Sequence, residues 1–575
     1  MRSKLYYILF LALAGIMMAA ALVTVRESAY FQPFKTASGT GDGETENSFI
    51  QVVSRESFEE RRQSLPEADF SPSDYLWRGG PAACDSEKAS VYLPCNVSAL
   101  TDLFAGLMPS APRSIIYVCR DEKMEDPAAA VAEGHAFEAL LVSGQHVQAF
   151  HIILTGLPAL CIEKTDREEI LNKEEHEGRL RYIPLDQTDA GTDFSEAADL
   201  SEAADLSEAA PDALLKCTFH VRGNVSSGLD KKPYKISLTN GAGEKMKVSL
   251  GGLRADDDWI LNPLYTDQSR VREMTAYTLW DRVSAFSDSP QASSRMRYVE
   301  VFLDHSYQGI YGLMEPVDGT QLGLSPGDLL YKIDRWDREY PYIDLYEESE
   351  GKTEIYNDYG FPCVEIRYPI AWDPSADWSP MQAFHEFSFR TKDPRSLTTA
   401  GLETDIDSVV TLSLYCAMTH AMDNNWKNSF LIAKQTDGGG YQLFRTIWDL
   451  NYVFGDVFIF EPDEKYTVFD PKTASGYTPC EDSTYDFEAF LQADPSLAGS
   501  LADKWAVWRQ GGISADSICQ DARAHMSRLT ESGALAREME RWPQQKNCAE
   551  ALDEMEEWIR ARFAYLDERY GWNAR

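Results

Sequence analysis

The chain of 575 residues has an ordinary globular composition, with 44% hydrophobic and 25% charged residues, which excludes a disordered chain, a collagen and a multi-span membrane protein. Asp and Glu number 92 against 54 Lys and Arg, so the formal net charge is −38. A chain this acidic, without a long Lys/Arg block, repels nucleic acid, and no nucleic-acid partner is expected. The 10 cysteines include no Cys-x-x-Cys pair, which disfavours zinc-ribbon and thioredoxin-like folds.

Residues 1–30 are expected to form a transmembrane anchor. Two basic residues, Arg2 and Lys4, precede an uncharged run from Leu5 to Val25. This run is as long as the roughly 20 residues that span a bilayer and longer than the roughly 7–15 of a signal-peptide core. A cleaved signal remains the alternative, because three small residues stand at 19–21. The bulk of the chain is then expected outside the cytoplasm, either held by a single membrane span or secreted.

An oxidising compartment would allow disulfides. Cys84 and Cys95 lie close in the sequence and are expected to pair. Other cysteines stand among apolar residues and are expected in the core, namely Cys119, Cys161, Cys217 and Cys416.

Composition divides the next part of the chain into three segments. Residues 31–80 are polar with little periodicity, which predicts a stalk. Residues 81–190 contain several short β-rich runs separated by turns, which predicts a small all-β sandwich. Residues 191–211 repeat the acidic hexamer Asp-Leu-Ser-Glu-Ala-Ala. Three such copies are too short for a solenoid, so they predict a linker.

Residues 212–575 predict a larger α+β domain. Strands alternate with one amphipathic helix over 268–286, and a buried helix is expected over 404–422. A hairpin is expected around Gly438–Gly440, and the chain beyond Tyr485 is mostly helical in pattern. The predicted elements come in the order strands with one helix, then a hairpin, then a helical bundle. This order is typical of a two-lobed kinase.

Three polar residues stand where phosphoryl-transfer chemistry needs them. Asp423 and Asn428 are separated by five positions just before the hairpin, and Asp449 follows it. Protein kinases place a base and a metal-binding Asn at this spacing, and a metal-binding Asp beyond the next hairpin. Asp423 is therefore the candidate base, and Asn428 and Asp449 are candidate Mg²⁺ ligands. The plainer alternative is that these residues only cap a helix end and a turn.

Phosphoryl transfer also requires cationic side chains that bind the phosphates, here called the phosphate clamp. Lys235 stands in a predicted strand, and Lys232 is a competing candidate. The chain has neither a Gly-rich GxGxxG loop nor a Walker A motif. The turn from Arg222 to Gly228 is the Gly/Ser-rich segment that could bind phosphate through its backbone N–H groups.

The joint order of these motifs closely resembles the CotH kinase family, the spore-coat protein H type. The segments that carry the resemblance run over roughly 212–570: Arg222-Gly223-Asn224, 231–236, Trp259–Asn262, 265–269 with Arg272, 299–301, 307–311, Met314-Glu315, Asp328–Lys332, 423–428, 448–455, 541–543 and 562–567.

The resemblance implies an atypical protein kinase fold that binds ATP and Mg²⁺ and phosphorylates serine on protein substrates. It gives the two essential acidic roles to Asp423 and Asp449, and it places Glu315 among the candidate nucleotide-binding residues. Many members carry Asp where this chain has Asn451, which is a third candidate metal ligand with one charge fewer. Glu273 is a further candidate, as an ion-pair partner of Lys235 from the predicted helix.

The function expected from the sequence is that of an exported, membrane-anchored serine kinase. The main alternative is a non-catalytic scaffold or surface-binding module of the cell envelope or spore coat, because little ATP is present outside the cytoplasm. A hydrolase that uses paired carboxylates is a third possibility, and it requires two acids close together.

Overall fold

The computed structural model describes residues 49–96, 103–166, 170, 173–185, 214–223, 226–289, 291–335, 354–356, 362–369, 377–456, 470–472, 484–544 and 546–572. The predicted anchor or signal segment, the stalk up to residue 48 and the 191–211 linker lie outside these residues. From Phe49 to Arg575 the chain forms one compact unit, with the mixed α+β structure that the sequence predicts. No helix in this described part is long and apolar enough to cross a membrane.

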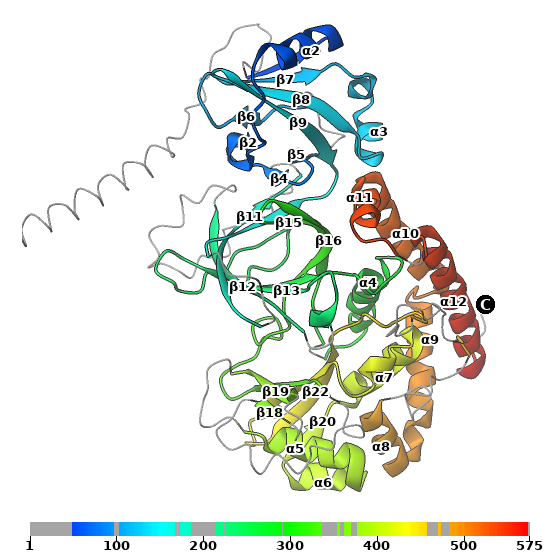
Figure 1. The fold of residues 1–575 in the computed structure, drawn as a ribbon. Helices are drawn as coiled ribbons and strands as arrows, with labels where there is room; N and C mark the ends of the chain where they lie inside the picture. Colours follow the sequence, from blue (N-terminus) through cyan, green and yellow to red (C-terminus); the bar gives the residue numbers. More distant parts are fainter. Residues whose placement is uncertain are drawn as a thin grey trace, which may run out of the picture. The chain divides into compact units, whose positions relative to one another are not determined.

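The first sheet, here called the N-terminal sheet, uses residues from the predicted stalk. Its strands, at the top of Figure 1, follow the order β1 (Ile50–Val53), β7 (Ile115–Cys119), β8 (Ala136–Ser143), β9 (His146–Thr155), β5 (Ser90–Pro94) and β4 (Ala83–Asp85). Helix α2 (Arg55–Ser64) begins after the N-cap Ser54 and buries Phe58 against this sheet. The stalk prediction is therefore wrong from residue 49 to residue 80, because β1 and α2 pack as parts of a folded layer.

A three-stranded sheet and one short helix complete this region. A three-stranded sheet has the order β3 (Gly80–Pro81), β2 (Tyr75–Trp77) and β6 (Leu107–Pro109). The short helix α3 (Pro127–Ala132) is capped by Asp126, whose side chain accepts from the backbone N–H of Ala129.

The β-rich segment 81–190 does not close as a separate sandwich. Its last strands, β10 (Ala159–Lys164) and β11 (His176–Ile183), belong to a closed barrel of order β10-β11-β12-β13-β14-β16-β15. The other barrel strands are β12 (Leu215–Val221), β13 (Tyr234–Thr239), β14 (Asp258–Asn262), β15 (Met296–Leu303) and β16 (Ser306–Met314). Strand β10 pairs in parallel with β15, a distant partner that local strand patterns cannot reveal.

Successive side chains of β13 point alternately into the barrel interior and to its outer face. Tyr234, Ile236 and Leu238 are buried in the barrel core, so Lys235 points to the opposite face. The antiparallel register places Lys235 opposite Ile260 of β14. Ile260 packs with helix α4 (Arg272–Ser284) in a different core, so this face is the outer one.

A third sheet, the hairpin sheet, lies below the barrel in Figure 1. Its order is β18 (Glu354–Tyr356), β19 (Pro362–Tyr368), β17 (Leu329–Ile333), β21 (Ser429–Gln435), β22 (Tyr441–Ile447) and β20 (Leu402–Thr404). The predicted hairpin is confirmed as β21–β22, and the predicted buried helix is α7 (Ile406–Thr419). Three helices lie near this sheet in Figure 1, namely α5 (Ser379–Glu386), α6 (Pro394–Thr399) and α8 (Tyr485–Ala493).

The predicted C-terminal helices are α9 (Ser500–Gln510), α10 (Ala515–Glu531), α11 (Ala534–Arg541) and α12 (Cys548–Arg569). Helix α10 packs on α4 beside the barrel, and α9 and α12 pack on α7. This helical layer therefore connects the barrel with the hairpin sheet.

Helix α11 buries a carboxylate against the barrel. The Glu538 oxygens accept from Lys231 Nζ at 2.8 Å, from Arg270 Nε at 3.0 Å and from the backbone N–H of Ile310 at 2.8 Å. The side chains of Lys231, Arg270 and Glu538 are all 0% exposed. The neighbouring Arg537 binds Glu300 of β15 at 2.9 Å.

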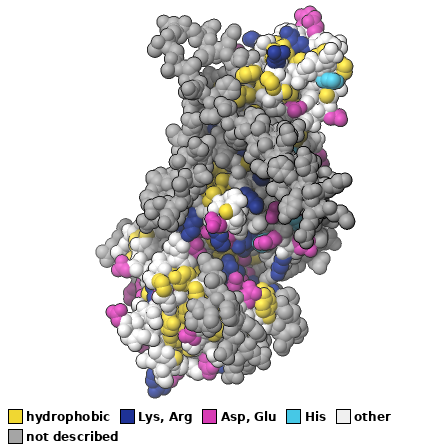
Figure 2. Space-filling view, turned by 90° about the vertical axis from the view of Figure 1, so that its left-hand side faces the viewer, with side chains coloured by type: hydrophobic (Ala, Val, Ile, Leu, Met, Phe, Trp, Pro, Cys, Tyr) yellow, Lys and Arg dark blue, Asp and Glu magenta, His cyan; other side chains and the backbone are white. Residues whose placement is uncertain are grey.

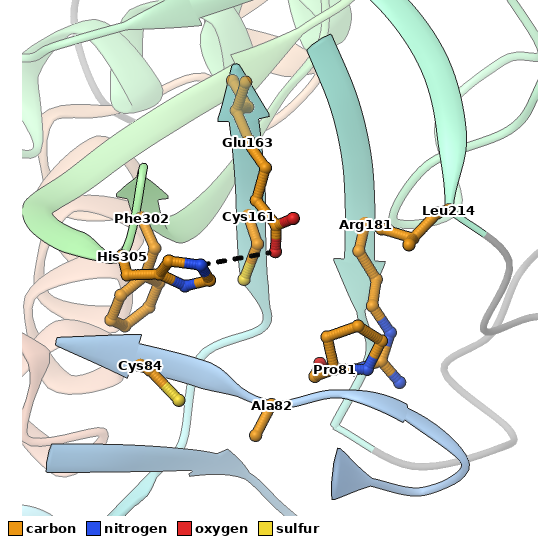
Figure 3. A pocket seen from close by; sticks show the side chains of 10 residues that line it. Pro81, Ala82, Cys84, Cys161, Glu163, Arg181, Leu214, Phe302 and His305 are labelled. Carbon is orange, nitrogen blue, oxygen red and sulfur yellow. Dashed lines mark hydrogen bonds and ion pairs between the residues drawn. The ribbon is translucent and has the colours of Figure 1, made fainter. Parts of the chain in front are cut away.

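The predicted disulfide between Cys84 and Cys95 is wrong, because both residues are free thiols. Cys84 lies opposite Val91 in the β4–β5 pair, so Cys95 lies beyond the end of β5. Figure 3 places Cys84 and Cys161 on the same small cavity, where His305 Nε2 lies 3.8 Å from a Glu163 oxygen. The predicted core positions of three other cysteines are confirmed, since Cys119, Cys217 and Cys416 are buried, whereas Cys161 is only partly so.

Glu538→Ala is expected to lower the free energy of unfolding by about 3–5 kcal/mol, because two buried cations would lose their counter-charge. Glu540→Ala on the same helix is the matched control. Glu540 pairs with Lys88 at 2.8 Å, and these side chains are 64% and 46% exposed, so the expected loss is under about 1 kcal/mol. Denaturant titration measures both, and equal losses would contradict the structural role of Glu538.

Candidate active site

The candidate site is built on the loop that follows α7. This loop contains the short helix η9 (Met422–Asn424). The side-chain amide of Asn424 donates to the backbone carbonyls of Asn428 at 2.9 Å and of Trp448 at 2.5 Å. It thereby ties this loop to the segment that carries Asp449.

Asp423 and Asn428 are in direct contact. The Asn428 amide donates to Asp423 Oδ2 at 2.9 Å, and Lys427 Nζ lies 2.8 Å from the same oxygen. Asn428 has a φ of 53°, in the left-handed region that Asn tolerates better than most residues. These contacts fix the orientation of the Asp423 carboxylate, and the Asp423 side chain is 12% exposed.

Asp449 is held through its backbone. Its N–H donates to the Tyr277 hydroxyl at 3.2 Å, and its φ is 56°. Burial, and then the negative charge of Asp423, raise the pKa of Asp449, whereas nearby cations oppose the shift, namely Arg222, Lys427 and Lys332. Among the described residues, no hydrogen bond or ion pair reaches the Asp449 carboxylate.

These donors fit a hard divalent cation. The Asp449 carboxylate and the Asn428 amide oxygen, beside the Asp423 carboxylate, are ligands that Mg²⁺ accepts. A cation near both carboxylates would also relieve the repulsion that raises the pKa of Asp449. Within the described ranges, no group of three or more His, Cys, Asp or Glu side chains is arranged to hold a metal. The amide, or oxygens of a bound phosphate, would therefore have to complete the coordination.

A cleft lies between the barrel and the hairpin sheet, next to this loop. The barrel side contributes Arg222, Lys235, Asp258 and Ile260, the chain after β16 contributes Pro316 and Val317, and the hairpin-sheet side contributes Lys332, Arg367, Phe430 and Trp448. Figure 2 shows charged side chains of both signs gathered across the middle of this face. The cleft thus combines four cations with an apolar and aromatic part.

Most of these cations already have a carboxylate partner. Lys235 Nζ lies 3.0 Å from Asp258 Oδ2, Lys332 Nζ lies 2.6 Å from Asp334 Oδ1, and Arg367 Nη1 lies 2.8 Å from Glu365 Oε1. Arg222 is placed differently, with its guanidinium 5.7 Å from the centre of the Trp448 ring. Burial lowers the pKa of Arg222, and the negative charge of Asp449 opposes this shift.

The structure separates the predicted clamp residues into two groups. Lys235 and Arg222 line the cleft. Lys232 instead donates to the Ser227 carbonyl at 3.1 Å. Glu315 is buried and accepts from the backbone N–H of Arg254 at 3.1 Å, so it lies beside the cleft without lining it.

Two other predicted residues lie close to Asp449. Glu273 accepts from the Asn262 amide at 2.8 Å and does not pair with Lys235, whose partner is Asp258. Asn451 has a buried Oδ1 atom that receives no hydrogen bond from the described residues. A buried oxygen of this kind is free to bind a ligand.

Of the ten lining residues, only Arg222 and Lys235 are predicted from the sequence, and all four on the hairpin-sheet side are missed, namely Lys332, Arg367, Phe430 and Trp448. The detectable signal was Lys332, the one charged residue in the apolar strand Leu-Leu-Tyr-Lys-Ile. Arg367 gave no such signal, because its placement depends on an irregular strand pairing.

A family model described as CotH kinase protein matches residues 219–566, which is more than half of the chain. The chain belongs to the CotH kinase family. No curated protein sequence matches it. The CotH kinase match contains every residue that lines the cleft, together with Asp423, Asn428 and Asp449. The N-terminal sheet and strands β10 and β11 precede the matched range.

Glu273→Gln is expected to change how stability depends on pH. Burial, and then the charge of Asp449, raise the pKa of Glu273 from 4.5 to about 8. Between these values the unfolded chain loses a proton that the folded protein keeps, so rising pH destabilises the native protein by up to about 1.4 kcal/mol per pH unit. Gln keeps the acceptor for Asn262 and carries no proton to lose.

The melting temperature of Glu273→Gln relative to the native protein should therefore rise from pH 5 to pH 8. Exposed Glu403→Gln on β20 is the matched control. A difference for Glu273→Gln that stays constant over this range would contradict the assignment.

Proposed function

We propose that this CotH kinase family member is an exported, membrane-anchored protein kinase that transfers phosphate from ATP to serine hydroxyls of a protein substrate. One observation carries the proposal. The cations Arg222 and Lys332 line the cleft and also act electrostatically on Asp449. A polyanion bound in the cleft would therefore lie beside the two carboxylates of the site.

The side chains that line the cleft suit the two parts of a nucleotide. Its aromatic pair, Phe430 and Trp448, has ring centres 6.1 Å apart, and aromatic and apolar side chains are suited to a planar base. The four cations on its two walls are suited to the phosphates.

Asp423 is the proposed acceptor of the serine proton. Asn428 and Lys427 hold its carboxylate in one orientation. As the serine oxygen attacks the γ-phosphorus, its proton passes to Asp423 and ADP leaves with the bridging oxygen. Asp449 and Asn428, with Asn451, are the residues that would hold Mg²⁺. When bound there, Mg²⁺ would neutralise charge that develops on the phosphates.

The location in the cell is proposed from the N-terminal sequence alone. The basic start and the apolar run over 5–25 support a membrane anchor with the folded unit outside the cytoplasm. The protein substrate would then be an extracytoplasmic or surface protein.

A non-catalytic scaffold is the second candidate. Its support is that Asn451 is neutral where the resemblance to the CotH kinase family implies a carboxylate, and that three of the four cleft cations already have carboxylate partners. Both features would weaken nucleotide binding, and both leave the fold intact.

Asp449→Asn is expected to abolish phosphate transfer from γ-labelled ATP while the melting temperature is kept. Loss of a metal-holding carboxylate should cost several kcal/mol of transition-state stabilisation. Asp437→Asn, in the exposed turn of the β21–β22 hairpin that precedes Asp449, is the control. This variant should transfer phosphate at the native level. Native-level transfer by Asp449→Asn would overturn this assignment.

Asn451→Asp is expected to bind Mg²⁺-ATP more tightly than the native chain. An added carboxylate near the ion increases the attraction for Mg²⁺, because this hard cation prefers charged oxygen ligands. Titration with ATP at fixed Mg²⁺ measures the difference. Equal or weaker binding would remove Asn451 from the metal ligands.

A further inference from the structure

We propose that Lys332 and Arg367 of the hairpin sheet form the second half of a polyphosphate clamp, opposite Lys235 and Arg222 of the barrel. The ligand class would be nucleoside triphosphates, which carry enough charge to engage both walls at once. This inference rests on the proposed function, because it takes the cleft as the nucleotide site.

The strand register explains why Lys332 faces the cleft. Lys332 lies opposite Phe430 of β21 on one side and opposite Glu365 of β19 on the other. Residues directly opposite each other share one face of a sheet. Phe430 lines the cleft, so the register carries the Lys332 side chain to the same surface.

A strand irregularity places Arg367. Ile366 pairs with Tyr331, and the next paired residue of β19 is Tyr368, opposite Leu330. Arg367 is therefore an extra residue, a β-bulge. Bulges redirect side chains and are frequent beside active sites. Here the redirected side chain lines the cleft.

The ion pairs of these residues have little structural use. Lys332 pairs with Asp334, and Arg367 pairs with Glu365, each only two positions away in the chain. A pair within one short segment joins no two elements, so neither pair holds the two sides of the cleft together. The pairs do reduce repulsion between the cations of the cleft, and the phosphates of a bound ligand would replace the carboxylates as partners.

The cations of the cleft differ in how far their side chains are exposed to water. The Lys332 side chain is 15% exposed, whereas Lys235 is 33% and Arg367 is 36% exposed. A charge–charge contact strengthens as water is removed. Lys332 is therefore expected to contribute more to phosphate binding than either of the more exposed cations.

Binding of ATP, AMP and inorganic tripolyphosphate to the complete chain tests the clamp. With Mg²⁺ present, Lys332→Met should weaken binding of ATP and tripolyphosphate by about 10- to 100-fold, the effect of losing one charge-assisted contact. AMP should lose much less. Lys332→Arg keeps the charge and should retain most of the affinity. Lys434→Met, in the same sheet but outside the cleft, is the matched control.

The outcomes separate the two proposals. If the native chain binds ATP, and Lys235→Met loses that binding while folded Lys332→Met keeps it, the second half of the clamp is wrong and the proposed function stands. If Lys332→Arg fails as badly as Lys332→Met, charge is not what Lys332 provides, and the clamp is again overturned. If the native chain binds neither ATP nor tripolyphosphate, both proposals fall.

Discussion

The buried carboxylate of Glu538 is the group on which the arrangement of the site depends. It binds Lys231, Arg270 and the backbone of β16 at once, with no exposure to water. Arg270 stands two residues before α4, and α4 carries Tyr277, whose hydroxyl accepts the N–H of Asp449. A C-terminal helix therefore sets the position of α4, and α4 in turn supports the site.

A second constraint is electrostatic. The structure brings Asp423 and Asp449 close enough that the charge of one raises the pKa of the other. Such an arrangement is costly in the absence of a cation, and it persists because the Asn424 amide and the Tyr277 hydroxyl fix the two segments through their backbones. Two neighbouring carboxylates beside a cationic cleft suit the metal-assisted phosphate transfer that we propose.

The sequence predicted the parts of the site that depend on local spacing. Asp423 and Asn428 contact each other because five positions in one loop bring them together, and Asp449 follows the hairpin as expected. Of the two candidate clamp lysines, Lys235 lines the cleft, whereas Lys232 binds the Ser227 carbonyl. Residues that depend on pairing between distant strands were missed, above all Lys332 and the bulged Arg367.

The same holds for the fold: elements with strong local patterns are predicted from the sequence, and pairings between distant strands are not. Helix α7 and the β21–β22 hairpin have strong local patterns and formed as predicted. The short, regularly spaced strands of segment 81–190 predict a sandwich, but β10 pairs with distant β15 and joins the barrel. Helix α2 is not predicted, because its sequence is mostly polar and only one of its residues, Phe58, is buried in the core.

The most direct test of the account is a crystal structure of the chain with Mg²⁺ and a non-hydrolysable ATP analogue. We expect the phosphates to lie between Lys235 and Lys332, and a metal to lie about 2.1 Å from an oxygen of Asp449. An analogue bound away from this cleft, or a metal that does not touch Asp449, would contradict it.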